Sequence, residues 1–197
     1  MDRTAQLEQM AEEHGGVLTA SMAVATGISR PAFSAFIRKH GYERVCSGIY
    51  RAPDAWPDEW YLLQLRCPSV IFSHGSALFL YDLTDREPMV PSVTARTGYN
   101  PSHLTKEGVK VYTVKNGLFE LGKTTRQTLF GNSVTVYDPE RTICDMVRSR
   151  HTVDRQVCLD ALKQYARRRD KDLRRLMEYA RLFRIEKILT SYLEVLL

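Results

Sequence analysis

The sequence lacks any hydrophobic run long enough to cross a membrane. Its longest unbroken apolar stretch is Ala77–Tyr81, whereas spanning a bilayer takes roughly 20 residues. Residues 1–16 also lack the basic start and apolar core of a secretory signal, and are acidic and amphipathic instead. These absences predict a protein with no membrane-spanning segment, no membrane partner and a cytoplasmic location.

Metal-binding patterns are missing as well. The cysteines include no Cys-x-x-Cys pair, and the histidines do not cluster near them. In a cytoplasmic protein such cysteines are expected to be reduced and mostly buried. We therefore expect no zinc site, no other metal and no cofactor. The cysteines are widely separated in the chain, at Cys46, Cys67, Cys144 and Cys158.

The sequence contains neither a Gly-x-Ser-x-Gly nucleophile elbow nor a glycine-rich phosphate-binding loop. Ser73, His74 and Ser76 do combine possible nucleophiles with a possible base. Adjacent side chains at the start of a helix rarely align for catalysis, however. We interpret Ser73 as the N-cap of that helix.

Three carboxylates, Asp138, Glu140 and Asp145, are candidates for the acidic metal cluster that an enzyme acting on nucleic acid would need. Asp138 precedes Pro139, a sequence typical of a helix N-cap, and Glu140 in the first turn complements the helix dipole. These features favour structural roles for the carboxylates. We therefore predict that the protein is not an enzyme.

Positive charge is present, and it is concentrated in two regions. Arg30–Arg51 contains five basic residues and one acidic residue, and residues 148–197 contain 13 basic and 7 acidic residues. Residues 52–147, between them, contain 9 basic and 11 acidic residues. This distribution favours a polyanionic partner such as nucleic acid, which both basic regions could contact.

The first 55 residues are predicted to form three short helices and a β-hairpin. One helix covers Thr4–His14 and ends at a Gly-Gly pair, a second follows Thr19, and a third follows Ser29. Residues 42–53, YERVCSGIYRAP, contain two β-rich runs around a Ser-Gly turn. Three helices followed by a basic hairpin are typical of a winged helix-turn-helix domain.

Small and apolar residues within this region have the spacing of a helix-turn-helix. Ala23 lies where the second and third helices would cross, and Gly27 makes the turn. Ile28, Phe33 and Phe36 would fill the core beneath the third helix. Five positions therefore agree with the motif.

The polar face of the third helix is suited to contact DNA. Arg30, Ser34 and Arg38 would point into a major groove, where arginine pairs with guanine and serine with several bases. Basic residues at the end of the helix and in the hairpin are better placed for phosphates. The alternative is a face that only meets solvent. The residues expected to bind DNA are Ser29, Arg30, Ser34, Arg38, Lys39, Arg44 and Arg51.

Residues 56–197 are predicted to form a second domain of mixed α/β structure that ends in a helical segment. Helix and strand patterns occur up to about residue 150, with β-rich runs around PSVTART, VKVYTV and SVTVYD. Three amphipathic helices are predicted after that point. The expected fold class is therefore α+β, with domains at 1–55 and 56–197.

Three segments, taken in order, carry a resemblance to a known family. They are GGVLTASMAVATGISRPAFSAFIRKHGYERVCSGIYRAP, FSHGSALFLYDL and DPERTICDMV. These segments resemble the AbiEi family of antitoxins from type IV toxin–antitoxin, or abortive infection, systems. The resemblance implies that the protein represses its own operon by binding inverted-repeat promoter DNA. It also implies that the protein counteracts a co-encoded nucleotidyltransferase-like toxin.

The basic stretch RRRDKDLRR, Arg167–Arg175, has two interpretations. Basic residues near a helix C-terminus are favoured by the dipole, and the interleaved Asp170 and Asp172 are typical of a solvated connection. Alternatively, the stretch is a contact surface for DNA, RNA or an acidic face of the toxin. The residues of this expected antitoxicity surface are Arg167, Arg168, Arg169, Arg174 and Arg175.

Two functions stay open at this stage. The first is the DNA-binding antitoxin, with residues 56–197 alone expected to neutralise the toxin, whether or not the two proteins touch. The second is an ordinary winged-helix regulator whose C-terminal domain binds a ligand or dimerises. In the first case we expect a monomer or weak dimer in solution and two copies on the operator, because one short helix and one hairpin cover too few base pairs.

Overall fold

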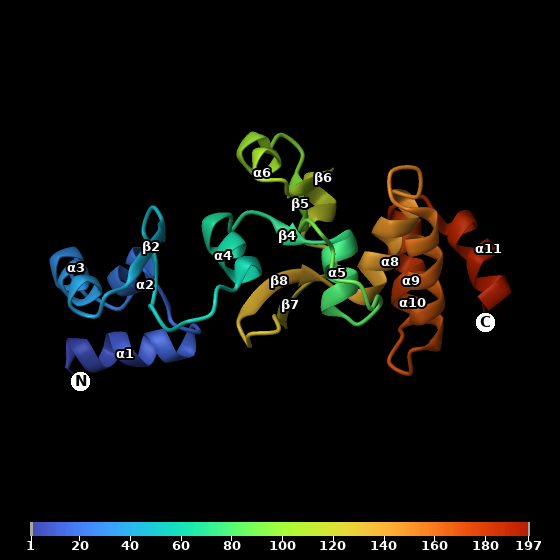
Figure 1. Cartoon of the computed structure of the whole chain (residues 1–197). Coiled ribbons are helices and arrows are strands. Elements are labelled where there is room, and N and C mark those ends of the chain that lie inside the picture. The colour runs from blue at the N-terminus through green and yellow to red at the C-terminus, as the bar shows by residue number, and fades with distance from the viewer. Residues whose placement is uncertain (1, 197) are drawn as a thin grey trace. The chain divides into compact units, whose positions relative to one another are not determined.

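The protein has a mixed α+β fold, seen in a computed structural model that describes residues 2–196. The chain divides into two compact units, and Figure 1 labels most of their helices and strands. The first contains the residues up to Cys67 and returns for Gln127–Ser133, and the second contains Pro68–Arg126 and the residues from Val134 onward. This division differs from the expected boundary after residue 55.

The first unit contains the three predicted helices, the predicted hairpin and two further elements. A three-stranded sheet has the order β1-β3-β2, with both pairs antiparallel, so that Leu18 pairs with Tyr50 and Arg44 also pairs with Tyr50. The elements are α1 (Arg3–Glu13), β1 (Val17–Thr19), α2 (Ala20–Ala25), α3 (Arg30–Lys39), β2 (Glu43–Cys46), β3 (Ile49–Arg51) and α4 (Glu59–Arg66). Strand β1 and the placement of α4 in this unit were not predicted.

A single hydrophobic cluster holds α1, α2 and α3 together. Leu7 of α1, Ala23 of α2 and Phe33 of α3 all lie in it, with 2%, 0% and 3% of their surface exposed. Full burial of a side chain of the size of leucine or phenylalanine contributes about 1.5–3 kcal/mol. The cluster therefore fixes the orientation of α3, and with it the direction of its polar face.

A buried carboxylate attaches residues 127–133 to the first unit. Asp58 caps α4 by accepting a hydrogen bond from the Tyr61 backbone N–H (3.1 Å), and it is 1% exposed. Its second oxygen accepts hydrogen bonds from the Thr128 hydroxyl and from Asn132 Nδ2 (2.5 and 2.8 Å). Because a buried charge needs such partners, Asp58 keeps the returning segment in place.

The second unit is a five-stranded sheet with helices. The strand order is β6-β5-β4-β8-β7, where β4 pairs antiparallel with β5 and parallel with β8, and β5 pairs parallel with β6. The strands are β4 (Ile71–Phe72), β5 (Ser92–Arg96), β6 (Lys110–Val114), β7 (Lys123–Gln127) and β8 (Ser133–Tyr137). The helices are α5 (His74–Leu80), α6 (Ser102–Lys106), α7 (Asn116–Phe119), α8 (Pro139–Arg148), α9 (Arg155–Arg167), α10 (Leu173–Leu182) and α11 (Glu186–Leu196).

Helix α8 is the central helix of the second unit. Every residue from Glu140 to Val147 is buried, and α8 packs against α5, α9 and α10. Asp138 caps it by accepting a hydrogen bond from the Arg141 backbone N–H (2.7 Å), as predicted. Within residues 2–196, no helix is both long enough and apolar enough to cross a bilayer.

Candidate nucleic-acid interface

Helix α3 has a buried apolar face and an exposed polar face. Phe33, Phe36 and Ile37 are buried, because residues three and four positions apart lie on one face of a helix. On the other side Arg30, Ser34, Arg38 and Lys39 are exposed. The structure therefore brings the predicted contact residues of this helix onto one solvent-facing surface, which we call the α3 face.

The beginning of α3 is fixed by its own sequence. The Ser29 hydroxyl accepts a hydrogen bond from the Ala32 backbone N–H (3.4 Å), and Pro31 lies in the first turn. The hydroxyl on which the expected DNA contact of Ser29 depends is therefore engaged as the helix cap. The α3 face is thus held at its N-terminal end by a local interaction.

The connection between α2 and α3 is short and specified by one glycine. Gly27 has a φ of +80°, which favours glycine, and no atom lies near the position of a side chain there. The backbone N–H of Ile28 donates to the carbonyl oxygen of Ala23 (2.9 Å), which closes the end of α2. Ala23 is completely buried, so the two helices approach closely at that residue.

The hairpin carries two of the predicted contacts, and the structure places them differently. Arg44 is exposed, with its Nε donating to the carbonyl oxygen of Cys46 (3.3 Å). Arg51 is half-buried and its Nη2 donates to Glu43 Oε2 across the strand pair (2.9 Å). Arg44 is therefore free to meet a phosphate, whereas Arg51 is engaged in holding β2 and β3 together.

The expected antitoxicity surface is divided between free and engaged arginines. Arg167 ends α9 and is exposed, as is Arg169 in the connection that follows. Arg168 donates to both carboxylate oxygens of Asp170 (2.9 and 2.7 Å) and to the carbonyl oxygen of Tyr81 (2.7 Å). These contacts tie the α9–α10 connection to the end of α5, which is a structural role for Arg168.

The two remaining arginines lie at the start of a helix and not at its end. Asp172 caps α10 through the Arg175 backbone N–H (2.9 Å), so Arg174 and Arg175 occupy the first turn. Positive charge is unfavourable near a helix N-terminus. The stabilising interaction with the dipole that the sequence suggested therefore applies to Arg167 alone.

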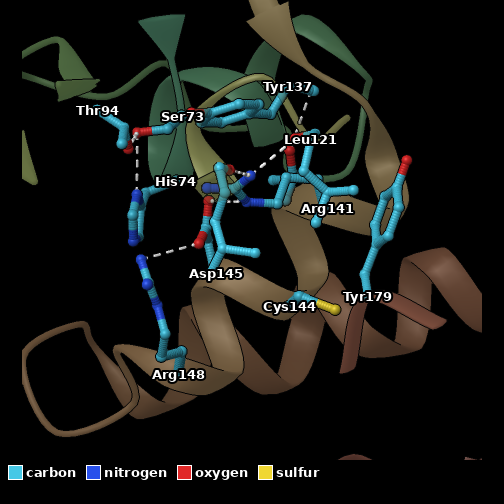
Figure 2. Close-up of polar contacts among 12 residues, drawn as sticks. Ser73, His74, Thr94, Leu121, Tyr137, Arg141, Cys144, Asp145, Arg148 and Tyr179 are labelled. Atoms are coloured by element: carbon cyan, nitrogen blue, oxygen red, sulfur yellow. Dashed lines mark hydrogen bonds and ion pairs between the residues drawn. The ribbon is translucent and has the colours of Figure 1, made fainter. Parts of the chain in front are cut away.

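The Ser73–His74 pair is part of a buried hydrogen-bond chain, drawn in Figure 2. The Thr94 hydroxyl donates to Ser73 Oγ (2.8 Å), and Ser73 Oγ is hydrogen-bonded to His74 Nδ1 (3.0 Å). His74 Nε2 lies 3.0 Å from the Ser149 hydroxyl. Ser73 is the N-cap residue of α5, as predicted, but its hydroxyl makes no capping hydrogen bond.

The burial of this hydrogen-bond chain favours a structural role for Ser73 and His74 over a catalytic one. Ser73 and His74 are 0% and 1% exposed, and the His74 ring stacks on Tyr112 with 3.4 Å between ring centroids. Burial, followed by the charges of Arg148, Lys110 and Arg141, holds the pKa of His74 well below 6.5. A neutral His74 with both ring nitrogens engaged joins α5 to β5 and to the end of α8.

The carboxylate Asp145 belongs to a buried ion-pair cluster, also visible in Figure 2. Arg141 and Asp145 are both completely buried, with Arg141 Nε donating to Asp145 Oδ2 (2.9 Å), and Arg148 Nη2 lies 3.0 Å from the other oxygen. Arg141 Nη1 donates to the carbonyl oxygens of Leu118 and Leu121 (2.8 and 2.7 Å). The Arg141 guanidinium therefore connects α8 to residues that precede β7.

Glu140 is likewise used within the fold. Its Oε1 accepts hydrogen bonds from the Tyr165 hydroxyl (3.0 Å) and from the Asp172 backbone N–H (3.1 Å). Over residues 2–196 there is no group of three or more His, Cys, Asp or Glu side chains placed to hold a metal ion. Glu140 therefore links α8 to α9 and to the start of α10, whereas Asp138 caps α8 and Asp145 pairs with two arginines of its own helix.

Sequence reasoning missed the importance of Arg141. A signal was present, because Arg141 and Asp145 are four residues apart, a spacing that favours an ion pair on a helix. On the exposed face of a helix, however, such a pair is common and contributes little to stability. Only the complete burial of α8 makes it a central feature of the second unit.

Comparison with known proteins gives a likeness in fold. No family model and no curated protein matches the chain. Among solved structures, the crystal structure of the RV2827C protein from Mycobacterium tuberculosis is similar to this protein. The alignment covers 91% of this chain and 72% of the RV2827C chain, with a TM-score of 0.56 and 15% sequence identity. The likeness shows the fold alone.

Proposed function

We propose that the protein is a transcriptional autorepressor whose first unit is a winged helix-turn-helix that binds promoter DNA. The observation that carries the proposal is the α3 face, where Arg30, Ser34 and Arg38 recur every four residues on the exposed side of a helix held by its buried side. A helix of this kind, preceded by a short glycine turn and a closely packed second helix, suits insertion into a major groove.

The basic side chains of the first unit have three different expected roles. Arg30 and Arg38 would pair with guanine edges, which is the arginine contact that specifies sequence. Lys39 and Arg44 are exposed and would neutralise phosphates. Arg51 would act through its ion pair with Glu43, by keeping the hairpin in shape.

Gel-shift titration at fixed salt tests the proposal, with the promoter DNA upstream of the gene as probe. Arg30→Ala and Arg38→Ala are each expected to cost about 1–3 kcal/mol on the specific site, since each would lose a bidentate base contact. The matched control is Arg3→Ala, which removes one exposed positive charge from α1 of the same unit. Affinity that stays at the wild-type level in both α3 variants would remove α3 as the recognition helix.

We further propose that the protein acts as an antitoxin, because its segments resemble the AbiEi family. It would then counteract a nucleotidyltransferase-like toxin encoded beside it. In the second unit the exposed side chains of Arg167, Arg169 and Arg174 are the better candidates for an antitoxicity surface. Two arginines of the expected surface are left out of it: Arg168 is needed for the α9–α10 connection, and Arg175 pairs with Asp172 (3.6 Å).

Growth rescue of cells that express the neighbouring gene tests the antitoxin function. The full chain is used, because a fragment of residues 56–197 would keep α4 and Gln127–Ser133 but lose the rest of the first unit to which they belong. Substituting Arg167, Arg169 and Arg174 together with alanine is expected to impair rescue and to leave operator binding unchanged, since distant sites behave independently. Full rescue by this variant would mean that the three arginines only meet solvent. The control triple substitutes exposed bases elsewhere in the unit, namely Arg155, Lys163 and Lys187.

A second candidate function is an ordinary winged-helix regulator whose second unit binds a ligand or dimerises. The absence of a nucleotidyltransferase reading frame beside the gene would favour this regulator. Failure of the protein to restore growth in the rescue experiment would favour it too. The DNA-binding part of the proposal is common to both functions and is tested separately by the gel shift.

A further inference from the structure

A groove of about 480 Å3 lies in the first unit, away from the α3 face. Its walls come from α1, from the buried side of α3, from the residues after β3 and from the returning segment 127–133. Three carboxylates line it, those of Glu8, Glu12 and Asp54. Among the described residues that line the groove, none is lysine or arginine.

The carboxylates of the groove come from two parts of the chain. Glu8 and Glu12 are exposed and one turn apart on α1, and Asp54 is exposed on the connection after β3. Tyr42, which also lines the groove, has a pKa raised by burial and then by the charges of Asp54 and Glu8. Asp54 and Glu8, which belong to different parts of the chain, therefore both act on the hydroxyl of Tyr42.

Two aromatic rings of the groove are unusually exposed. Trp56 and Phe130 have 77% and 51% of their surface exposed, and neither belongs to the hydrophobic cluster of α1, α2 and α3. Indole and phenyl faces attract cations, arginine more often than lysine. Exposed rings beside carboxylates thus provide both parts of a cation-binding surface.

We propose that this acidic–aromatic groove binds a basic segment of a partner protein, in extended conformation, with arginine or lysine at alternate positions. Glu8 and Glu12 lie about 6 Å apart, one helical turn along α1. Alternate side chains of an extended peptide are about 6.6 Å apart. One basic side chain can therefore meet each carboxylate of α1, while a neighbouring arginine lies over Trp56.

The groove and the proposed DNA contacts occupy different sides of α3. Phe36 and His40 line the groove, whereas Arg38 lies on the exposed α3 face. Binding of a basic peptide therefore leaves the α3 face open. The inference does not rest on the proposed function, and operator affinity is expected to be the same in groove variants.

Isothermal titration calorimetry on the full chain in low salt tests the proposal, with the acetylated and amidated peptide Arg-Leu-Arg-Leu-Lys as probe. We expect saturable binding that is about tenfold weaker in the triple variant Glu8→Gln, Glu12→Gln, Asp54→Asn, since each exposed charge pair contributes modestly. Trp56→Ala is expected to weaken binding roughly threefold. The control Glu13→Gln removes an exposed carboxylate of α1 that does not line the groove, and it should bind like the wild type.

Three results would overturn the proposal. The first is the absence of saturable binding, or equal affinity in the triple variant whose circular dichroism matches that of the wild type. The second is spermidine binding as tightly as the peptide, which would make the groove a site for small cations. The third is self-association, measured by sedimentation, that the triple variant abolishes, because the occupant would then be a second copy of this chain.

Discussion

Asp145→Asn removes the charge from the most deeply buried ion pair of the second unit with almost no change of shape. Arg141 would keep its two carbonyl partners, Leu118 and Leu121, but its guanidinium would be a completely buried charge without a counter-ion. Breaking a buried pair in this way typically costs 3–5 kcal/mol, so we expect a loss of about 3–5 kcal/mol. Arg148 adds less, because its side chain is 28% exposed and water can replace Asp145.

Urea unfolding at neutral pH, followed by far-ultraviolet circular dichroism, measures the loss. The chain has two tryptophans, Trp56 and Trp60, and both belong to the first unit, so tryptophan fluorescence reports that unit separately. Arg181→Ala, which breaks the exposed pair with Glu186, is the control and should leave the transition unchanged. An Asp145→Asn variant within about 1 kcal/mol of the wild type would refute the reasoning, since surface pairs contribute that little.

A double variant distinguishes the charge from the packing. Arg141→Met with Asp145→Leu removes both charges and fills much of the same space. Replacement of a buried pair by apolar residues is often close to neutral, whereas each single change leaves one charge unpaired. The double variant should therefore cost clearly less than the sum of the singles, by about 1 kcal/mol or more. Additive costs would mean that the two side chains do not act as a pair.

Three further results are expected. Footprinting of the promoter should show both halves of an inverted repeat protected at saturation, and protection of one half alone would contradict binding by two copies. Arg44→Ala should weaken binding to every DNA sequence and lower the salt slope by roughly one unit, whereas Arg51→Ala should act mainly on hairpin stability. Because the folded state lowers the pKa of His74, the unfolded chain binds the extra proton below about pH 6.5, and stability should fall by up to about 1.4 kcal/mol per pH unit as the pH drops from 6.5 towards 5. His74→Asn, which tolerates the φ of +49° at this position, should abolish that slope in urea titrations at several pH values.

Local signals in the sequence predict most of the first unit. Ser29 with Pro31, Gly27, and the apolar spacing of Phe33 and Phe36 depend on neighbours within a few residues, and the structure places these residues in the cap, turn and core that were predicted. Strand β1 was missed because three residues carry no readable alternation. Its existence depends on pairing with β3, more than 30 positions further along.

Features that depend on contacts distant in sequence were not predicted. Asp58 meets Thr128 across 70 positions, and no property of either residue alone indicates the other. Arg168 was assigned to a contact surface because it is basic, and its bond to the carbonyl oxygen of Tyr81 spans 87 positions. The exposure of the α3 face was predicted, since it follows from helical periodicity alone, whereas its role in binding DNA stays a prediction.

The return of residues 127–133 to the first unit means that the chain passes between the two units three times, after Cys67, after Arg126 and after Ser133. After a single cut near Cys67, the fragment that ends there would stay bound to residues 127–133 of the other fragment through non-covalent contacts such as Asp58 to Thr128, so an intact complex on a native gel would hide the cleavage. For the same reason a chimaera that exchanges the first unit with that of a relative must transplant two stretches of chain together. A graft of the amino-terminal stretch alone would leave Asp58 facing the wrong partners.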